Sequence, residues 1–131
     1  MNNNFKSDLR AQFDEVTSLF DLLPSGWVNS FVPRLRERLF NILGSYAEDF
    51  VLLDAKEKFG ELRVHWAWRA RDYSKSEFEY TVTLQNDIDD VLFYYRHVSA
   101  NTCISCGDKA NHFSKKYDVP ICEMCANSKR K

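Results

Sequence analysis

The sequence predicts an α+β fold with two N-terminal helices, a three-stranded antiparallel sheet, one further helix and a C-terminal four-cysteine ribbon. Three observations predict it. Apolar residues recur every three or four positions near the N-terminus, they alternate with polar residues in the middle of the chain, and all four cysteines lie after residue 102. We therefore expect an α+β body over residues 1–100 and an appendage packed on it over residues 101–131.

The first two elements follow the helical period. One apolar stripe predicts a helix over residues 7–23 with Ser7 as its N-cap, and the Leu-Pro-Ser-Gly segment that follows breaks it. A second stripe predicts a helix from Ser30 to Gly44, with Pro33 in its first turn and the glycine as its C-terminal stop. We expect Trp27, just before this second helix, to pack into the core.

The middle of the chain changes to a period of two. An apolar run over residues 50–53 and alternation over residues 62–69 predict a hairpin with its turn near Phe59 and Gly60. A two-residue turn places Leu53 opposite Trp66 and Val51 opposite Trp68 on the buried face.

The same register places Lys56 opposite Arg63 on the other face of the hairpin. Like charges directly across a ladder are destabilising. Three explanations stay open: the register differs, the flanking Glu57 and Glu61 screen the charges, or an acidic partner lies there.

Two further elements complete the body. Alternation over residues 78–84 predicts the third strand of the sheet. Apolar spacing over residues 86–99 predicts the last helix, with Asn86 as its cap and with Asp87 and Asp89 in its first turn, where negative charge suits the helix dipole.

The four cysteines form two pairs, Cys103-x2-Cys106 and Cys122-x2-Cys125, separated by fifteen residues. This spacing is typical of a zinc site, and four thiolates would leave no open position for a catalytic water. The sequence therefore predicts a structural Zn²⁺ in a four-cysteine zinc ribbon. Two disulfides are the alternative, but the first 102 residues hold no cysteine. Whether His112 replaces one ligand stays open.

Composition and charge set the broad class. The chain has 131 residues, 18 Lys and Arg, and 19 Asp and Glu, which is ordinary for a globular domain. It shows no apolar run of membrane-helix length and no secretory pattern at its N-terminus, so we expect a cytoplasmic protein. Residues 1–102 hold twelve basic and sixteen acidic side chains, whereas residues 103–131 hold six and three.

Catalytic patterns are missing from the sequence. It contains no nucleophile elbow, no phosphate-binding glycine loop and no H-E-x-x-H helix. Its three histidines, His65, His97 and His112, fall on different predicted elements. His65 is expected opposite Asp54 on the open face of the hairpin, an arrangement that a solvated sheet face also provides by chance. We therefore expect a protein that is not an enzyme.

Three motifs together resemble a family of small bacterial and phage-associated proteins. They are Gly26-Trp27, the segment Lys-Glu-Lys-Phe-Gly-Glu-Leu-Arg at residues 56–63, and the two cysteine pairs with Gly107 after the first. The resemblance covers residues 26–70 and 100–126 and implies an accessory protein of a mobile element, in a setting where immunity proteins and inhibitors occur. The strand-like stretch at residues 78–84 departs from that family.

The functional hypothesis is a non-enzymatic protein-binding module, most concretely an immunity or inhibitor protein that covers the surface of a toxin or enzyme. An acidic body suits a basic partner, and aromatic residues anchor interfaces. The candidate contact residues are Lys56, Lys58, Phe59 and Arg63. The alternative is a nucleic-acid-binding zinc-ribbon adaptor that uses the lysines of residues 109–131.

Overall fold

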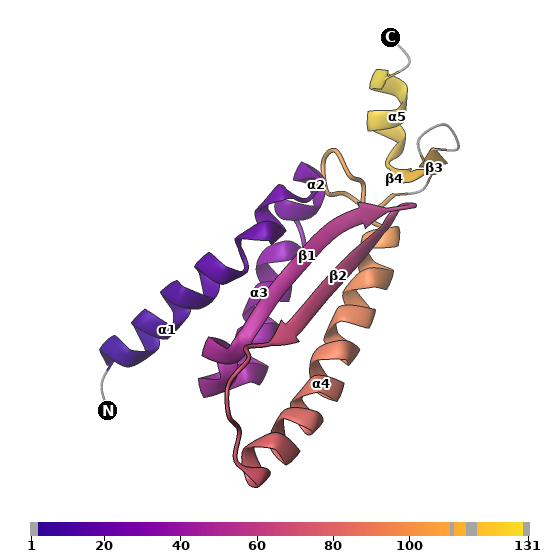
Figure 1. The fold of residues 1–131 in the computed structure, drawn as a ribbon. Helices are drawn as coiled ribbons and strands as arrows, with labels where there is room; N and C mark the ends of the chain where they lie inside the picture. The colour runs from indigo at the N-terminus through magenta and orange to yellow at the C-terminus, as the bar shows by residue number, and fades with distance from the viewer. Residues whose placement is uncertain (1–2, 111, 115–117, 130–131) are drawn as a thin grey trace.

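The computed structural model describes residues 3–110, 112–114 and 118–129 of the chain. Its elements are α1 (Asn3–Val16), η1 (Ser18–Leu22), α2 (Ser25–Val28), α3 (Val32–Leu43), η2 (Gly44–Asp49), β1 (Phe50–Lys58), β2 (Glu61–Trp68), α4 (Lys75–Ala100), β3 (His112–Ser114), β4 (Val119–Ile121) and α5 (Glu123–Lys129), where η marks a 3₁₀ helix. The hairpin of β1 and β2 packs between α1 on one side and α4 on the other, over α3, and the last three elements lie beyond its turn (Figure 1). The mixed α and β composition agrees with the prediction.

The first predicted helix is wrong at both ends. α1 already contains Ser7, so this residue is not its cap, and the α-helix ends at Val16 and continues as η1. Between the two lies Thr17, which is fully buried and whose hydroxyl donates to the carbonyl of Phe13 at 2.6 Å. A side chain that bonds the preceding turn bends a helix. Arg36 of α3 also donates to this hydroxyl and fixes the bend.

The second predicted helix is confirmed as α3. Pro33 lies in its first turn, and Gly44 ends it with a φ of +55°. One stripe of the helix is buried, formed by Val32, Leu35, Leu39 and Leu43. Trp27 of α2 is also fully buried, as predicted, and its indole Nε1 donates to the carbonyl of Thr102 at 3.1 Å.

The predicted hairpin is confirmed, but its register changes along its length. Near the turn, Ala55 faces Val64 and Lys56 faces Arg63, as a two-residue turn requires. Beyond a bulge at Leu53 the pairing shifts by one, so Leu52 and not Leu53 faces Trp66. The predicted pairing of Val51 with Trp68 is wrong for the same reason, because Trp68 faces Phe50.

The bulge decides which β1 side chains enter the core. The side chains of a regular strand alternate between faces, and one extra residue reverses that alternation. Phe50 and Leu52 are buried on one side of the bulge, whereas Leu53 is 58% exposed. On the other side Ala55 packs against the core and Lys56 points to solvent.

The predicted third strand is wrong. Residues 78–84 belong to α4, which runs without a break from Lys75 to Ala100, so Asn86 lies inside this helix and is not a cap. The helix begins at Ser74, where a capping box pairs Ser74 with Glu77. Residues 78–84 alternate between apolar and polar, but their sequence also fits the spacing of a helix. The buried residues of α4 follow this helical spacing. Its buried residues are Thr81, Leu84, Ile88, Val91, Tyr95 and Ser99.

The sheet is therefore smaller than predicted. In the described residues β1 pairs only with β2, and a separate two-stranded sheet joins β3 and β4. Neither edge of the larger sheet has a third strand within residues 3–110, 112–114 and 118–129. Among the described residues, no helix has the combination of length and apolar character needed to cross a membrane.

A buried carboxylate orients the segment between β2 and α4. Asp49 is almost fully buried and accepts hydrogen bonds from Arg69 at 3.0 Å and from Arg71 at 2.8 and 2.9 Å. Arg71 bonds it most strongly, and the two arginines together lower the pKa of Asp49 although burial opposes this. Arg71 also bonds Glu77, so the same guanidinium connects the core to the first turn of α4.

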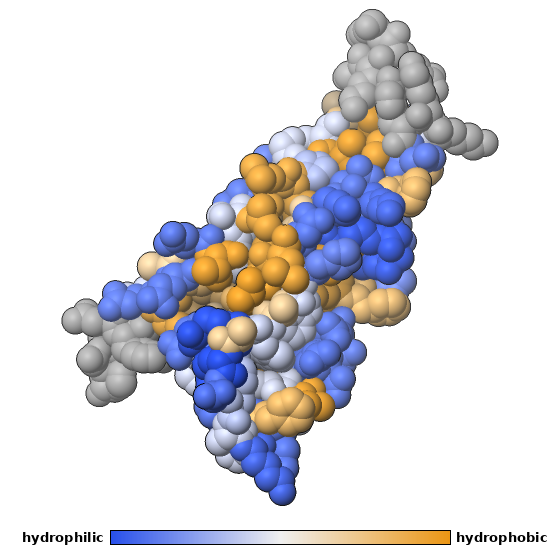
Figure 2. Space-filling model, in the orientation of Figure 1, coloured by the Kyte–Doolittle hydropathy of each residue, from blue (hydrophilic) through white to orange (hydrophobic). Residues whose placement is uncertain are grey.

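Apolar side chains are also exposed where η1 meets β1. Leu22 of η1 and Leu53 of β1 are both exposed, and an apolar band is visible along this part of the front face (Figure 2). The exposure of Leu53 is a direct result of the bulge.

The bulge gives a prediction with a built-in control. Leu52→Ala should lower the free energy of unfolding by about 2–5 kcal/mol, as for other buried leucines. Leu53→Ala should change it by no more than about 0.5 kcal/mol, as for other exposed positions. Urea denaturation of the two variants measures both values. A larger loss for Leu53→Ala than for Leu52→Ala would show that the strand keeps a regular register.

Candidate metal centre

Four cysteines from two separate segments converge beyond the end of the hairpin. Cys103 and Cys106 lie in the loop after α4, Cys122 directly follows β4, and Cys125 lies in α5. Their sulfur atoms all lie within 4.8 Å of one another, and the sulfurs of Cys106 and Cys122 are 3.5 Å apart. All four are free thiols, so the disulfide alternative is not what the structure forms.

The first cysteine pair is held in a tight turn. The N–H of Gly107 donates to the carbonyl of Cys103 at 3.0 Å, and the N–H of Cys103 donates to the carbonyl of Asp108 at 2.8 Å. Gly107 has a φ of +86°, a conformation that glycine adopts at little cost. The turn directs both thiols to the same side, as the spacing predicted.

The second pair uses the start of α5. Cys122 is buried, and its carbonyl accepts the N–H of Ala126 at 2.9 Å. Its sulfur accepts the backbone N–H of Cys125 at 3.4 Å. Amides that point at a sulfur favour the thiolate, which is the form that binds metal.

The four sulfurs fit a tetrahedral metal ion. Metal–sulfur bonds of about 2.3 Å place the sulfurs of a tetrahedral site about 3.8 Å apart. The observed separations of 3.5 Å and of no more than 4.8 Å bracket this value. Four cysteine ligands would fill the coordination shell, so the geometry suits a metal that stabilises structure.

The thiol pKa values diverge because four such groups share one small space. Burial acts to raise the pKa of Cys103, but backbone amides of Cys122, Cys106 and Ser105 outweigh it and lower the pKa to about 6. The hydrogen bond to Cys122, followed by burial, raises the pKa of Cys125 to about 12. An amide at Asp108 lowers the pKa of Cys106, yet neighbouring thiols and burial leave it raised. The thiolate is favoured at Cys103, whereas the thiols of Cys106 and Cys125 need a cation beside them to ionise.

His112 was left open as a fifth candidate ligand. Its backbone belongs to β3, opposite Ile121, but its side chain lies outside the described residues. The other two histidines lie away from the cysteines, His65 on β2 and His97 on α4. His65 faces Asp54 as predicted, and the carboxylate of Asp54 pairs with Lys56 at 3.5 Å.

The metal-binding loop rests on α2 through direct backbone contact. The N–H of Gly26 donates to the carbonyl of Ile104 at 2.8 Å. A Cβ atom on Gly26 would lie 2.2 Å from the carbonyl oxygen of Cys103 and 2.7 Å from the nitrogen of Gly107. A Cβ atom on Gly107 would in turn lie 2.6 Å from the carbonyl oxygen of Gly26. Each glycine is required because the other backbone occupies the space of its side chain.

The turn of the hairpin contacts the other side of the same appendage. A Cβ atom on Gly60 would lie 2.7 Å from the ring of Phe113 and 3.2 Å from Pro120. The carbonyl of Pro120 accepts the N–H of Ile104 at 3.2 Å, which connects β4 to the first cysteine turn. The three motifs that were far apart in the sequence therefore meet at one place, a convergence that their spacing alone could not indicate.

The four predicted contact residues share the turn half of the hairpin. Lys56, Lys58 and Phe59 are exposed, and Arg63 is half-buried. Lys56 does face Arg63, and acidic neighbours screen both charges: Asp54 pairs with the lysine, and Glu61 pairs with the arginine at 3.2 Å.

Glu57, which one of the three open explanations had screening these charges, has another role. Its carboxylate accepts the N–H of Gly60 at 2.7 Å and closes the turn. The sequence also gave no sign that Phe59 has a φ of +54° or that Trp68 Nε1 and Arg63 Nε are buried without a hydrogen-bond partner among the described residues.

Comparison with protein-family models, with curated proteins and with solved structures found no match to this chain. The resemblance to small phage-associated proteins therefore remains a prediction. The metal centre rests on its own geometry.

Because Gly26 contacts the loop of Cys103 and Cys106, the packing of the body should influence the affinity of the cysteines for a metal ion. Gly26→Ala should weaken Zn²⁺ binding, because the new methyl group displaces Cys103 and Gly107. Gly44→Ala is the control, since its Cβ meets no atom within 4 Å and its cost is limited to a positive φ. Competition titration with a chromophoric chelator measures both affinities. Equal affinities for the two variants would contradict the coupling.

The raised thiol pKa values predict proton release. At pH 7 the thiols of Cys106 and Cys125 are protonated, so binding of Zn²⁺ should release at least two protons. The affinity should rise as the pH increases from 6 to 8, because the concentration of the protons that compete with Zn²⁺ for these thiols falls. Calorimetry in buffers of different ionisation enthalpy counts the protons. Release of fewer than one would show that the thiols are already ionised.

Proposed function

We propose that this protein is a non-enzymatic, zinc-stabilised module that binds another protein through the turn of its hairpin. The observation that carries the proposal is Phe59, an aromatic residue that is 66% exposed and has a φ of +54°. A bulky residue in the left-handed region costs free energy, on the order of 1–3 kcal/mol. Asparagine would fit this position in a type I′ turn more easily. Because Phe59 in this conformation lowers the stability of the fold, we infer that its exposed ring serves to contact a partner.

The proposed metal is Zn²⁺ in a structural role. Thiolates are soft ligands, and a tetrahedral set of four sulfurs suits zinc and iron–sulfur chemistry. The spacing of the two pairs matches zinc ribbons. In this role the ion holds the loop that supports the turn of the hairpin, since Phe113 and Pro120 lie against Gly60.

The surroundings of Phe59 supply further contacts. The ammonium group of Lys58 lies 5.7 Å from the centre of its ring, and Lys56 is exposed on the same half of the hairpin. Beyond this basic patch the body is acidic, with sixteen acidic and twelve basic side chains in residues 1–102. A matching partner would have an acidic patch that meets the basic turn, surrounded by basic residues that face the acidic body.

The specific form of the proposal is an inhibitor or immunity protein that covers the surface of a toxin or enzyme. It is supported by the lack of a convergent catalytic group in the described residues: their two histidine side chains lie on different elements, and the four cysteines suit a closed shell. A surface that binds and blocks needs no chemistry of its own.

A substitution at the turn tests this proposal. Phe59→Asn should raise the free energy of unfolding by about 1 kcal/mol, because asparagine tolerates the left-handed conformation. It should also abolish retention of the partner when the zinc-loaded protein is used as bait in an extract of the native host. Thermal melting and quantitative mass spectrometry of retained proteins measure the two effects.

Phe78→Asn is the matched control. Phe78 is an exposed aromatic residue of similar exposure at the opposite end of the molecule, in α4. This variant should retain the same partner as the wild-type protein. The proposal fails if Phe59→Asn retains every stoichiometric partner, or if the bait retains only nucleic acid that salt removes.

A further inference from the structure

Among the residues that the structure describes, no strand lies beside the outer edge of β2, which is a row of backbone groups. The N–H of Arg69 donates to the carbonyl of Asp49, in line with β1, whereas the N–H of Leu62 donates away from β1 to the hydroxyl of Ser99 at 2.8 Å. Backbone groups alternate along a strand, so those of Val64 and Trp66 point the same way as that of Leu62. An extended chain is the natural partner of such an edge.

A groove runs along this edge between β2 and α4. The two elements touch at Ser99 and diverge towards the far end of the hairpin (Figure 1). Two adjoining hollows lie between them, of about 270 Å³ at the narrow end and about 480 Å³ at the wide end. Both share Val64 and Trp66 as lining residues. The groove thus follows the edge through most of β2.

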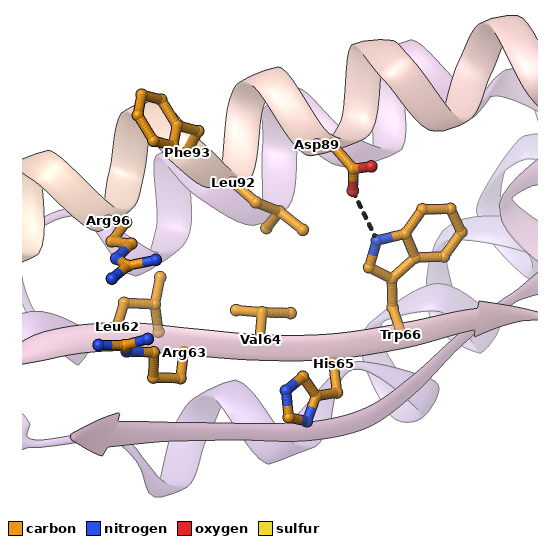
Figure 3. Close-up of a pocket in the computed structure, with 9 residues that line it drawn as sticks. All are labelled: Leu62, Arg63, Val64, His65, Trp66, Asp89, Leu92, Phe93 and Arg96. Carbon is orange, nitrogen blue, oxygen red and sulfur yellow. Dashed lines mark hydrogen bonds between the residues drawn. The ribbon is translucent and has the colours of Figure 1, made fainter.

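One hydrogen bond links the two walls across the groove. Trp66 donates from Nε1 to the carboxylate of Asp89 at 3.2 Å, as Figure 3 shows, and this bond lies where the two hollows adjoin. The exposed ring of Phe93 stands at the rim of the narrow hollow, with Leu92 beside it (Figure 3). The opening is therefore built into the packing of strand against helix.

Two residues that line the groove each carry a buried donor with no hydrogen-bond partner in the described part of the chain. They are Arg63, whose Nε is buried and which lines the narrow hollow, and Trp68, whose indole Nε1 is buried and which lines the wide one. A buried donor without a partner costs about 1–3 kcal/mol. A small turn of either side chain towards the groove would let its donor meet a carbonyl or carboxylate oxygen of a bound peptide.

The charge at the narrow end identifies the kind of peptide. Arg63 and Arg96 both donate to the single carboxylate of Glu61, at 3.2 and 2.9 Å. Two positive charges therefore share the carboxylate of Glu61, and both arginines line the hollow. The acidic residue of the same lining, Asp89, is bonded to the indole of Trp66 and not to either arginine. A carboxylate on the bound chain would complete this arrangement.

We propose that the groove between β2 and α4 binds an extended, acidic segment of a partner protein, which adds to the edge of β2 as a third strand. This inference rests on the proposed protein-binding function and assigns a second contact surface to it. The segment pairs with the backbone of Val64 and Trp66 and displaces the hydrogen bond from Trp66 to Asp89 that crosses the groove. It places an acidic side chain at Arg63 and Arg96.

The test uses synthetic peptides and the isotopically labelled, zinc-loaded protein. The probe is an acetylated and amidated Glu-Val-Glu-Val-Glu-Val-Glu peptide, and its control replaces each glutamate with lysine. In two-dimensional NMR the acidic peptide should shift the amide signals of Val64 and Trp66 and the indole signal of Trp68. The lysine peptide should bind at least about tenfold more weakly, since it meets two arginines.

A pair of variants isolates the backbone contact. Val64→Pro removes the outward N–H and leaves the ladder to β1 intact, as proline does on edge strands. Val64→Ala removes most of the same side chain but keeps that N–H. Val64→Pro should weaken the acidic peptide at least about tenfold relative to Val64→Ala. If Val64→Pro does not fold, the backbone nitrogens of every second residue of the acidic peptide can be methylated instead. This removes the peptide's own hydrogen bonds to the edge of β2 and should weaken binding in the same way.

Two results would overturn the inference. One is equal binding of the acidic and lysine peptides, and the other is a set of shifts confined to residues 56–60. A partner that is retained by wild-type protein, lost with Phe59→Asn and unaffected by Val64→Pro would remove the groove and leave the proposed function intact. Loss of that partner with Val64→Pro but not with Val64→Ala would support the groove independently of the peptides.

Discussion

The structure depends on one close approach of two backbones, where α2 meets the turn that carries the first cysteine pair. Gly26 and Gly107 each occupy a position at which a methyl group would overlap the other segment. Trp27, the neighbour of Gly26, fills the core and donates to Thr102, the neighbour of Cys103. The packing of the body thereby sets the position of the sulfurs. A metal ion at the cysteines would stabilise that contact from the other side, because it fixes the turn that Gly26 touches.

The bulge at Leu53 has a comparable influence on the hairpin. It places Phe50 and Leu52 in the core and still leaves Lys56 outside, so that one hairpin presents an apolar inner face and a charged outer face near its turn. Because the extra residue lies in β1, the backbone groups of β2 keep a regular spacing along their outer edge. The two strands therefore have different roles: β1 absorbs the irregularity, and β2 presents an ordered edge towards α4.

The sequence predicted those features that depend on local spacing. The cysteine pairs, the stop of α3 at Gly44 and the turn at Phe59 and Gly60 are each encoded within a few residues. The strand predicted at residues 78–84 failed because that stretch satisfies two periods, and the capping box at Ser74 together with the burial of Thr81 and Leu84 selects the helix. The bulge and the contact of Gly26 with the cysteine turn join segments far apart in the chain, so no local pattern could indicate them. The unpaired donors of the groove were hidden for the same reason.

The order of assembly follows from how far apart these contacts lie in the chain. Cys106 and Cys122 are 16 positions apart, whereas Trp27 and Thr102 are 75 positions apart. A short loop closes at a lower entropic cost than a long one. The sulfurs can therefore come together around a metal ion before the turn of the first cysteine pair contacts α2. The contact of the cysteine turn with α2 closes a much longer loop, so we expect it to form later in folding. Because the packing of the body sets the position of the sulfurs, a metal ion bound before this contact forms should be held less tightly than one bound after it.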